Sequence, residues 1–187
     1  MNRNALQWIA VLALTSLGTD SAVAATTRDA AREAQARLED TLLIARVKGA
    51  LITDQVTKAH RINIETFHGI VQLSGFVSSQ TEKTRAGEVA AAVPGVVEVR
   101  NAIEVRQKLA NRGTDRLIDD GALTTRVKAA LIADENTGAR AINVETYQGV
   151  MQLSGFVGSS SERRQASGVA RAVTGVGQVR NDLQIGP

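Results

Sequence analysis

An internal repeat constrains the fold of this 187-residue chain more than any other feature of its sequence. The segment from Asp40 to Val105 aligns with the segment from Asp120 to Ile185, and the offset of 80 residues holds without a gap. About half of the paired positions are identical, and two copies are too few for a solenoid. The repeat therefore predicts two small globular modules in tandem, each of about 65 residues.

Each copy predicts the element order helix, strand, strand, helix, strand. Leu43, Val47 and Leu51 recur at helical spacing after Asp40. Alternating apolar and polar residues predict strands near 62–65, 70–77 and 97–105. Ser79 with Glu82 forms a capping box that begins a second helix. Because a helical crossover joins parallel strands, the predicted fold is α+β, with a three-stranded mixed sheet covered by two helices in each module.

Repeated glycines mark positions where the backbone turns or is closely approached. The sequence His68-Gly69, matched by Gln148-Gly149, suits a tight hairpin turn, and Pro94-Gly95 ends a helix. The glycines expected to have structural roles are Gly69, Gly75, Gly95, Gly149, Gly155 and Gly175.

These residues carry a resemblance to a known family. The pattern Ile62-x-Ile64-x-Thr66-x-x-Gly69-x-Val71-x-Leu73-x-Gly75-x-Val77, continued by Val93-x-Gly95-Val96-x-x-Val99-x-Asn101, resembles the BON domain. The second copy repeats the pattern from Ile142 to Asn181. The resemblance implies a periplasmic, non-catalytic binding protein without cofactors. It also implies contact with phospholipid surfaces, as proposed for some members, or a role in envelope-protein quality control or osmotic stress.

The N-terminal segment has the three parts of a secretory signal. Arg3 precedes an apolar run over residues 5–17, and Ala22-Val23-Ala24 has the small residues of a cleavage site. The run is shorter than the about 20 residues that a spanning helix needs, so we expect no transmembrane segment in the mature chain. The expected organisation is a signal peptide over 1–24, a lead-in over 25–37, BON domains over 38–106 and 117–187, and a linker over 107–116. Residues 26–39 either extend the first helix or form a mobile lead-in.

The sequence argues against an enzyme, a metal site and a nucleic-acid partner. There is no cysteine, and the two histidines, His60 and His68, are replaced by Arg140 and Gln148 in the second copy. Glu65 with Glu145 and Arg100 with Arg180 are interpreted as solvated charges or cross-strand ion pairs. Few aromatic residues are available to stack on bases.

Two surfaces are candidates for binding. The first module has seven basic and seven acidic residues, so the net charge of +3 concentrates in the connector and the second copy. The candidate lipid or partner residues there are Arg112, Arg116, Leu123, Arg126 and Lys128. On the outer sheet face the candidates are Ile70, Phe76, Val150 and Phe156.

Three functional hypotheses follow from these surfaces. The first is contact with anionic phospholipid through the basic residues, and the second is a periplasmic chaperone that holds unfolded envelope proteins through the apolar sheet face. The third is a structural adaptor between envelope proteins. Pairing of the two modules is the favoured interpretation of the apolar face, and the oligomeric state stays open.

Overall fold

The computed structural model describes residues 19–57, 59–106, 114–138 and 141–186, with side chains from residue 27 onward except over 114–119. The chain divides into two compact units, residues 1–38 and 39–187. Most of the predicted signal peptide lies outside the described residues. Helix α1 runs over Thr19–Thr53, so residues 26–39 extend the first helix of the repeat. Cleavage after Ala24 remains a prediction.

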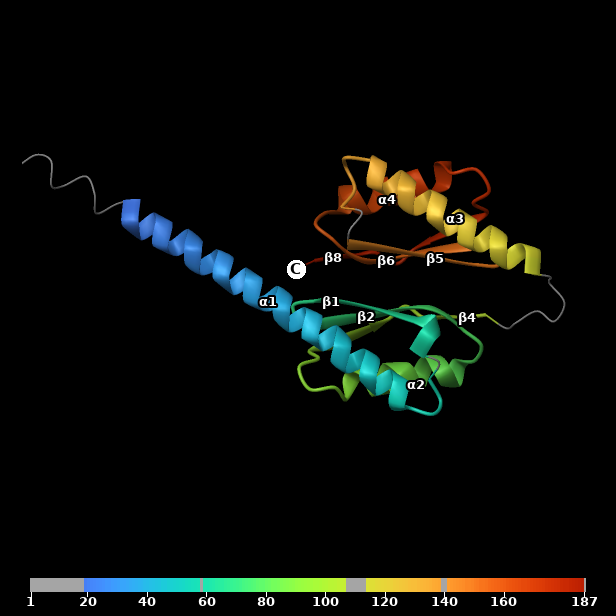
Figure 1. Ribbon diagram of the computed structural model, residues 1–187, viewed down its shortest axis with the longest axis horizontal. Coiled ribbons are helices and arrows are strands. Elements are labelled where there is room, and N and C mark those ends of the chain that lie inside the picture. The colour runs from blue at the N-terminus through green and yellow to red at the C-terminus, as the bar shows by residue number, and fades with distance from the viewer. Residues whose placement is uncertain (1–18, 58, 107–113, 139–140, 187) are drawn as a thin grey trace, which may run out of the picture. The chain divides into compact units, whose positions relative to one another are not determined.

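Both modules lie within the second unit and contain equivalent elements (Figure 1). After α1, the first module has the 3-10 turn η1 (Ala59–Arg61), strands β1 (Ile62–Phe67) and β2 (Ile70–Val77), helix α2 (Gln80–Ala91), and strands β3 (Glu98–Asn101) and β4 (Glu104–Val105). The second module has helix α3 (Thr114–Ala133), strands β5 (Ile142–Tyr147) and β6 (Val150–Val157), helix α4 (Ser160–Ala172), and strands β7 (Gln178–Asn181) and β8 (Gln184–Ile185).

The sheet topology is the predicted mixed one. Strand β1 pairs antiparallel with β2, with Ile62 opposite Gly75, and β3 pairs parallel with β2 after the α2 crossover. Strands β5, β6 and β7 repeat this arrangement. The fold class, an α+β chain with two tandem modules, is therefore confirmed.

The last strand of each module differs from the prediction, because it is broken into two. Asn101 accepts a hydrogen bond from the Ile103 N–H and donates one to the carbonyl oxygen of Lys83. This local turn interrupts the ladder, and both β3 and β4 pair with β2. Asn181 makes the equivalent bonds to Leu183 and Arg163. The carbonyl oxygens of residues 102 and 182, at these breaks, accept hydrogen bonds from glutamine side chains of the other module.

Each module has its own apolar core between its sheet and its helices. In the first module the buried stripe Leu43, Val47 and Leu51 of α1 packs with Ala86 and Ala90 of α2 against the inner strand residues. The second core has the same positions, with Met151 in place of Val71. Small alanines on α2 and α4 let these helices lie close to their sheets.

An aspartate in each opening helix fixes the hairpin that follows. The carboxylate of Asp40 accepts hydrogen bonds from the backbone N–H groups of His68 at 2.7 Å and Gly69 at 3.0 Å. Both turn residues have positive φ, as a two-residue hairpin turn of this hand requires. Asp120 binds Gln148 and Gly149 in the same way. These aspartates therefore join helix to hairpin.

Within residues 39–187 the two sheets lie face to face, and the helices cover their outer sides (Figure 1). The hydroxyl oxygens of Ser74 on β2 and Ser154 on β6 are 2.8 Å apart in the middle of this contact. The surface that each sheet turns away from its own helices is thus occupied by the other module.

Candidate functional site

The contact between the sheets is built around two buried glutamines. Gln72 accepts a hydrogen bond from the Gly155 N–H at 2.7 Å and donates one to the carbonyl oxygen of Asp182 at 2.6 Å. Gln152 accepts one from the Gly75 N–H at 2.8 Å and donates to the carbonyl oxygen of Ala102 at 2.8 Å. Each amide thereby satisfies backbone groups of the opposite module, which lowers the cost of burying polar groups there.

Aromatic rings flank the glutamines on both sides. Phe76 of β2 stacks on Tyr147 with ring centroids 5.4 Å apart, and Phe156 of β6 stacks on Phe67 at 5.6 Å. Phe76 is 4% exposed and Phe156 is 8% exposed. The Phe and Tyr residues in the described part of the chain therefore all lie in the contact between the two modules.

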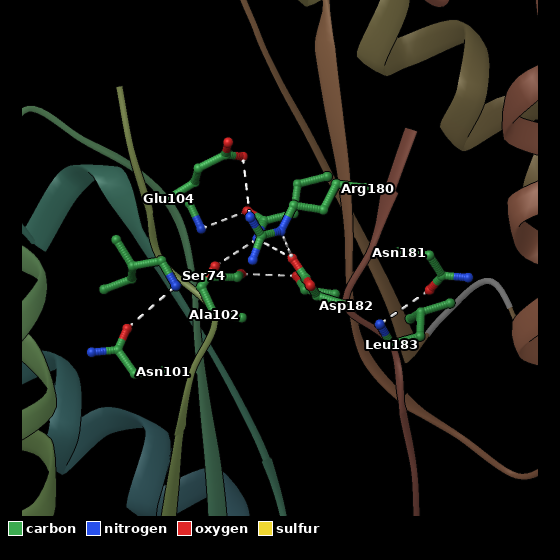
Figure 2. Close-up of polar contacts among 12 residues, drawn as sticks. Ser74, Asn101, Ala102, Glu104, Arg180, Asn181, Asp182 and Leu183 are labelled. Carbon is green, nitrogen blue, oxygen red and sulfur yellow. Dashed lines mark hydrogen bonds and ion pairs between the residues drawn. The ribbon is translucent and has the colours of Figure 1, made fainter. Parts of the chain in front are cut away.

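Charged groups close the edge of the contact, as Figure 2 shows. Arg180 lies between Asp182 of its own module, at 2.6 Å, and Glu104 of the first module, at 3.7 Å. Glu104 also pairs with Arg106 at 2.6 Å. On the equivalent side Arg100 donates to the Gln184 side chain at 3.2 Å. Arg100 and Arg180 are thus partly buried, and each contacts a residue of the other module. Alternation within one module does not predict these contacts.

Two equivalent carboxylates are also drawn into this region. Burial raises the pKa of Glu65, and the nearby positive charge of Lys128 opposes the rise. Burial likewise raises the pKa of Glu145, opposed by the hydrogen bond that Asn63 donates to it and by Lys128. Of the two interpretations made from the sequence, a solvated charge or a cross-strand ion pair, the solvated one does not hold for these carboxylates, because both are partly buried.

Two glycines let the strands approach one another. Gly75 and Gly155 have φ values of 115° and 118°, and a Cβ at either position would collide with a backbone carbonyl oxygen, that of Arg61 or that of Ala141. All six glycines singled out from the sequence have positive φ. The N–H groups of Gly75 and Gly155 donate hydrogen bonds to the side-chain oxygens of Gln152 and Gln72 in the other module.

The apolar candidates of the outer sheet face are placed in this contact. Phe76 and Phe156 are buried, while Ile70 and Val150 are partly buried at the ends of their strands. With the two modules paired, which we call the closed chain, Phe76 and Phe156 stack on rings of the other module. A client-binding role for them would require the modules to separate.

The outward face of α3 is the second candidate surface. Ala122, Thr125, Ala129 and Ile132 lie on one side of the helix, and all four are exposed, with Ile132 at 73%. Helical spacing places Arg126 on one flank of this stripe and Lys128 on the other, and both are exposed. The result is a narrow face of small and apolar residues bordered by two cations.

A hollow of about 460 Å³ lies beside Arg126. It is lined by Arg126 and Asp120 of α3, the β5–β6 turn, and the loop with Gly175 and Gly177. In the first module Val97 occupies the position of Gly177, and a Cβ on Gly69 would lie 2.9 Å from it. A Cβ on the equivalent Gly149 would meet nothing within 4 Å. Gly177 therefore makes this part of the second module more open than its counterpart.

The other candidates of the connector and second module do not lie on this described outer surface. Arg112 lies outside the described residues, and Arg116 lies in the first turns of α3, where side chains are not described. Leu123 is 4% exposed and belongs to the second core, so the structure places it inside the module. Arg126 and Lys128 are the basic candidates on the described outer surface.

Two structural features are absent from the described residues. They contain no group of three or more metal-ligating side chains that could hold an ion. Across the same residues no helix is long and apolar enough to cross a bilayer.

Sequence reasoning missed Gln72, Gln152, Asp40 and Asp120 as interacting residues. A signal for the glutamines was present, because an identical Gln-Leu-Ser-Gly-Phe-Val segment in both copies places a long polar side chain between apolar ones. The two copies are identical at only about half of their positions, yet the glutamine recurs unchanged in both. A polar residue that recurs in this way on the outer sheet face indicates that the face is covered by other protein groups.

Comparison with known proteins gives the same two modules. The family model described as the BON domain matches residues 39–107 and 119–187. The chain is 39% identical over 148 residues to osmotically-inducible protein Y of Escherichia coli, covering 79% of this chain and 73% of that protein.

Two further relatives cover a similar share of the sequence. The chain is 32% identical to a 21 kDa hemolysin of Actinobacillus pleuropneumoniae, covering 79% of this chain and 75% of that one. It is 31% identical to the outer membrane lipoprotein DolP of Haemophilus influenzae, covering 84% and 80%. The chain therefore belongs to the BON-domain family, with two BON domains in tandem.

Proposed function

We propose that this protein is a non-catalytic periplasmic binding protein that contacts anionic phospholipid surfaces through the outward face of α3. The observation that carries the proposal is the exposed stripe of Ala122, Thr125, Ala129 and Ile132 between Arg126 and Lys128. A helix of this kind lies in the plane of a membrane interface, with its apolar stripe toward the acyl chains and its cations among anionic headgroups.

The hollow beside Arg126 supports a headgroup contact at one flank of this helix. Its size admits a phosphate with its glycerol, and the Arg126 guanidinium lines it. A guanidinium suits a phosphate because it can donate two parallel hydrogen bonds. The excess of basic residues in the connector and second module would add an attraction of roughly 1 kcal/mol per cation near the surface.

The outward face of α1 is the natural internal comparison. Leu42, Ala45, Gly49 and Ile52 form its stripe, and Arg46 and Lys48 flank it. Because the helices cover opposite outer sides of the paired sheets, one flat membrane can contact only one of these faces. We favour α3 because of the hollow beside Arg126 and the more basic second module.

The names of two relatives agree with an envelope role. One is called osmotically inducible, and another is called an outer membrane lipoprotein. These names support the proposal of a periplasmic protein that acts during osmotic or envelope stress. The chaperone hypothesis draws no support from the closed structure, since the aromatic rings on which it relied are buried between the modules.

The test is flotation of the chain from Ala25 to Pro187 with vesicles of phosphatidylglycerol or of phosphatidylcholine, at low and high salt. We expect binding to phosphatidylglycerol alone, and weaker binding at high salt, since exposed charges are screened. Arg126→Glu should weaken flotation strongly, while the matched Arg46→Glu should leave it largely intact. Equal loss from both variants, or binding that ignores salt and headgroup charge, would contradict the proposal.

A further inference from the structure

The contact between the modules is symmetric in its chemistry. Gln72 binds Gly155 just as Gln152 binds Gly75, and the ring of Phe76 meets Tyr147 just as Phe156 meets Phe67. The two serines that meet in the middle, Ser74 and Ser154, are themselves equivalent residues. Each of these interactions therefore recurs with the modules exchanged, as in an isologous interface between identical subunits.

This symmetry has a consequence for a single module. If one face carries both the donor and the acceptor of each of these hydrogen bonds, and both rings of each stacked pair, it is complementary to a copy of itself. The first-module face carries the glutamine amide of residue 72 and also the groups equivalent to its partners, the Gly75 N–H and the Ala102 carbonyl oxygen. Two first modules related by a twofold axis can thus form the whole set of glutamine bonds, with Ser74 meeting Ser74 of the other copy and Phe67 meeting its Phe76.

The charged edge distinguishes the two faces. In the closed chain Arg180 faces Glu104, and Arg100 faces Gln184, which is the residue equivalent to Glu104. Two first modules would place Arg100 of each copy against Glu104 of the other, which gives two ion pairs. Two second modules would place Arg180 against the neutral Gln184. The first face therefore has the better complement in itself.

The carboxylate of Asp182 disfavours the pairing of two second modules. The amide nitrogen of Gln152 lies 2.8 Å from the Ala102 carbonyl oxygen and 2.7 Å from the Asp182 carboxylate, so this carboxylate is close to residue 102 of the opposite module. Two second modules would bring both Asp182 carboxylates into that space, whereas two first modules would bring two alanines. Like charges at such a contact disfavour association.

We propose that the inner face of the first module, defined by Gln72, Ser74, Gly75, Arg100 and Glu104, is a self-pairing surface for a second copy of this chain. When the modules separate, the first module pairs with the first module of another copy. The second module then keeps its outer helix free and leaves its own inner face open. The occupant is a second copy because its face offers the same partners that the second module offers, with stronger ion pairing at the edge.

The experiment uses the full chain with Ser74→Cys, since the native chain has no cysteine. The matched opening substitutions are Gln152→Ala and Gln72→Ala. Each removes one amide that binds two backbone groups of the opposite module, so both weaken the pairing of the two modules within one chain. Gln152→Ala also removes a hydrogen bond to the Asp182 carboxylate. Only Gln72 takes part in the proposed dimer, and it does so twice.

We expect Ser74→Cys with Gln152→Ala to form at least about ten times more disulfide-linked dimer under mild oxidation than Ser74→Cys with Gln72→Ala, since two lost amides leave four buried groups unpaired in the dimer. Sedimentation velocity of the two glutamine variants without cysteine should show the same order. Equal yields, a higher yield for Gln72→Ala, or monomers in both would overturn the proposal.

A second pair of variants covers the case in which a glutamine variant fails to fold. Arg180→Glu places a carboxylate against Glu104 in the closed chain and leaves the first-module face untouched. Adding Arg100→Glu to it keeps the chain open and places like charges across the proposed dimer. Dimer from the single variant, lost in the double variant, supports the proposal, and the same dimer yield from both contradicts it. Ser154→Cys with Arg180→Glu, which reports pairing of second modules, should yield little dimer.

Discussion

At the scale of single residues, close approach of backbones decides which glycines cannot be replaced. Gly155 has a φ of 118°, and a Cβ there would collide with the Ala141 carbonyl oxygen. Gly168 on α4 lies in open space, where a Cβ would meet nothing within 4 Å. Position 155 therefore requires glycine, whereas position 168 has room for a side chain.

We predict that Gly155→Ala lowers the free energy of unfolding by about 2 kcal/mol or more, because the new methyl group adds both strain and a collision. Gly168→Ala should be neutral or raise stability by about 0.5–1 kcal/mol, as replacement of a helical glycine does. Urea denaturation followed by circular dichroism measures both. A Gly155→Ala protein as stable as the parent would show that β6 does not approach Ala141 in this way.

A second residue-scale prediction concerns pH and Glu145. Its pKa is raised by burial, so this carboxyl group favours the folded state most when it is protonated. The contribution is fully present below the carboxyl's ordinary pKa of 4.5 and is lost as pH rises through the raised value in the folded chain.

Glu145→Gln should therefore be more stable than the parent at pH 7 and close to it near pH 4, since the neutral amide resembles the protonated acid. Denaturation midpoints at the two pH values measure the difference. Glu135→Gln, at an exposed position, is the control and should change neither midpoint. A gain in stability that is the same at both pH values would contradict the assignment.

At the scale of elements, each opening helix is tied to the hairpin after it by one aspartate. Asp120 lies in α3 and accepts hydrogen bonds from Gln148 at 2.6 Å and Gly149 at 2.9 Å. We predict that Asp120→Ala lowers the free energy of unfolding by about 1–3 kcal/mol, because both N–H groups lose a charged acceptor. Hydrogen exchange should quicken at these two amides, while Glu135→Ala should leave it unchanged. If the Gln148 and Gly149 amides kept the same protection from hydrogen exchange in Asp120→Ala, Asp120 would not hold the hairpin to the helix.

Most elements could be predicted from the sequence because their signals are local. Alternation, helical spacing and the serine caps place the strands and helices. Ser79 and Ser159 accept the predicted bonds from the backbone N–H groups of Glu82 and Glu162, whereas the two glutamate side chains accept from the residue before the cap, Ser78 or Gly158, and not from the cap itself. Asn101 and Asn181, at inward positions of the last strand, predict a bulge or a hydrogen-bonded structural role, and Asn101 donates a hydrogen bond to the Lys83 carbonyl oxygen across the crossover. Alternation alone does not show that the strand divides into two at this point.

At the scale of the whole molecule, the contact between the modules was favoured from the apolar residues of the sheet face, but its geometry was not. The reciprocal bonds of Gln72 and Gln152 depend on how two separate sheets meet, and no local pattern encodes that. The same arrangement explains why Glu65 and Glu145 are partly buried although alternation turns them away from their own cores. The basic helix face could be found in part, since Arg126 and Lys128 are exposed while Leu123 belongs to the core.

The face-to-face pairing of the sheets is the central claim, because the orientation of α3 and the self-pairing surface both follow from it. The most direct measurement is oxidation of the full chain with Ser74→Cys and Ser154→Cys, whose parent hydroxyl oxygens are 2.8 Å apart. We predict rapid, nearly complete formation of a disulfide within one chain, seen as a loss of free thiols by mass spectrometry while the protein stays monomeric. Two thiols that remain free, or that react only between chains, would contradict the account.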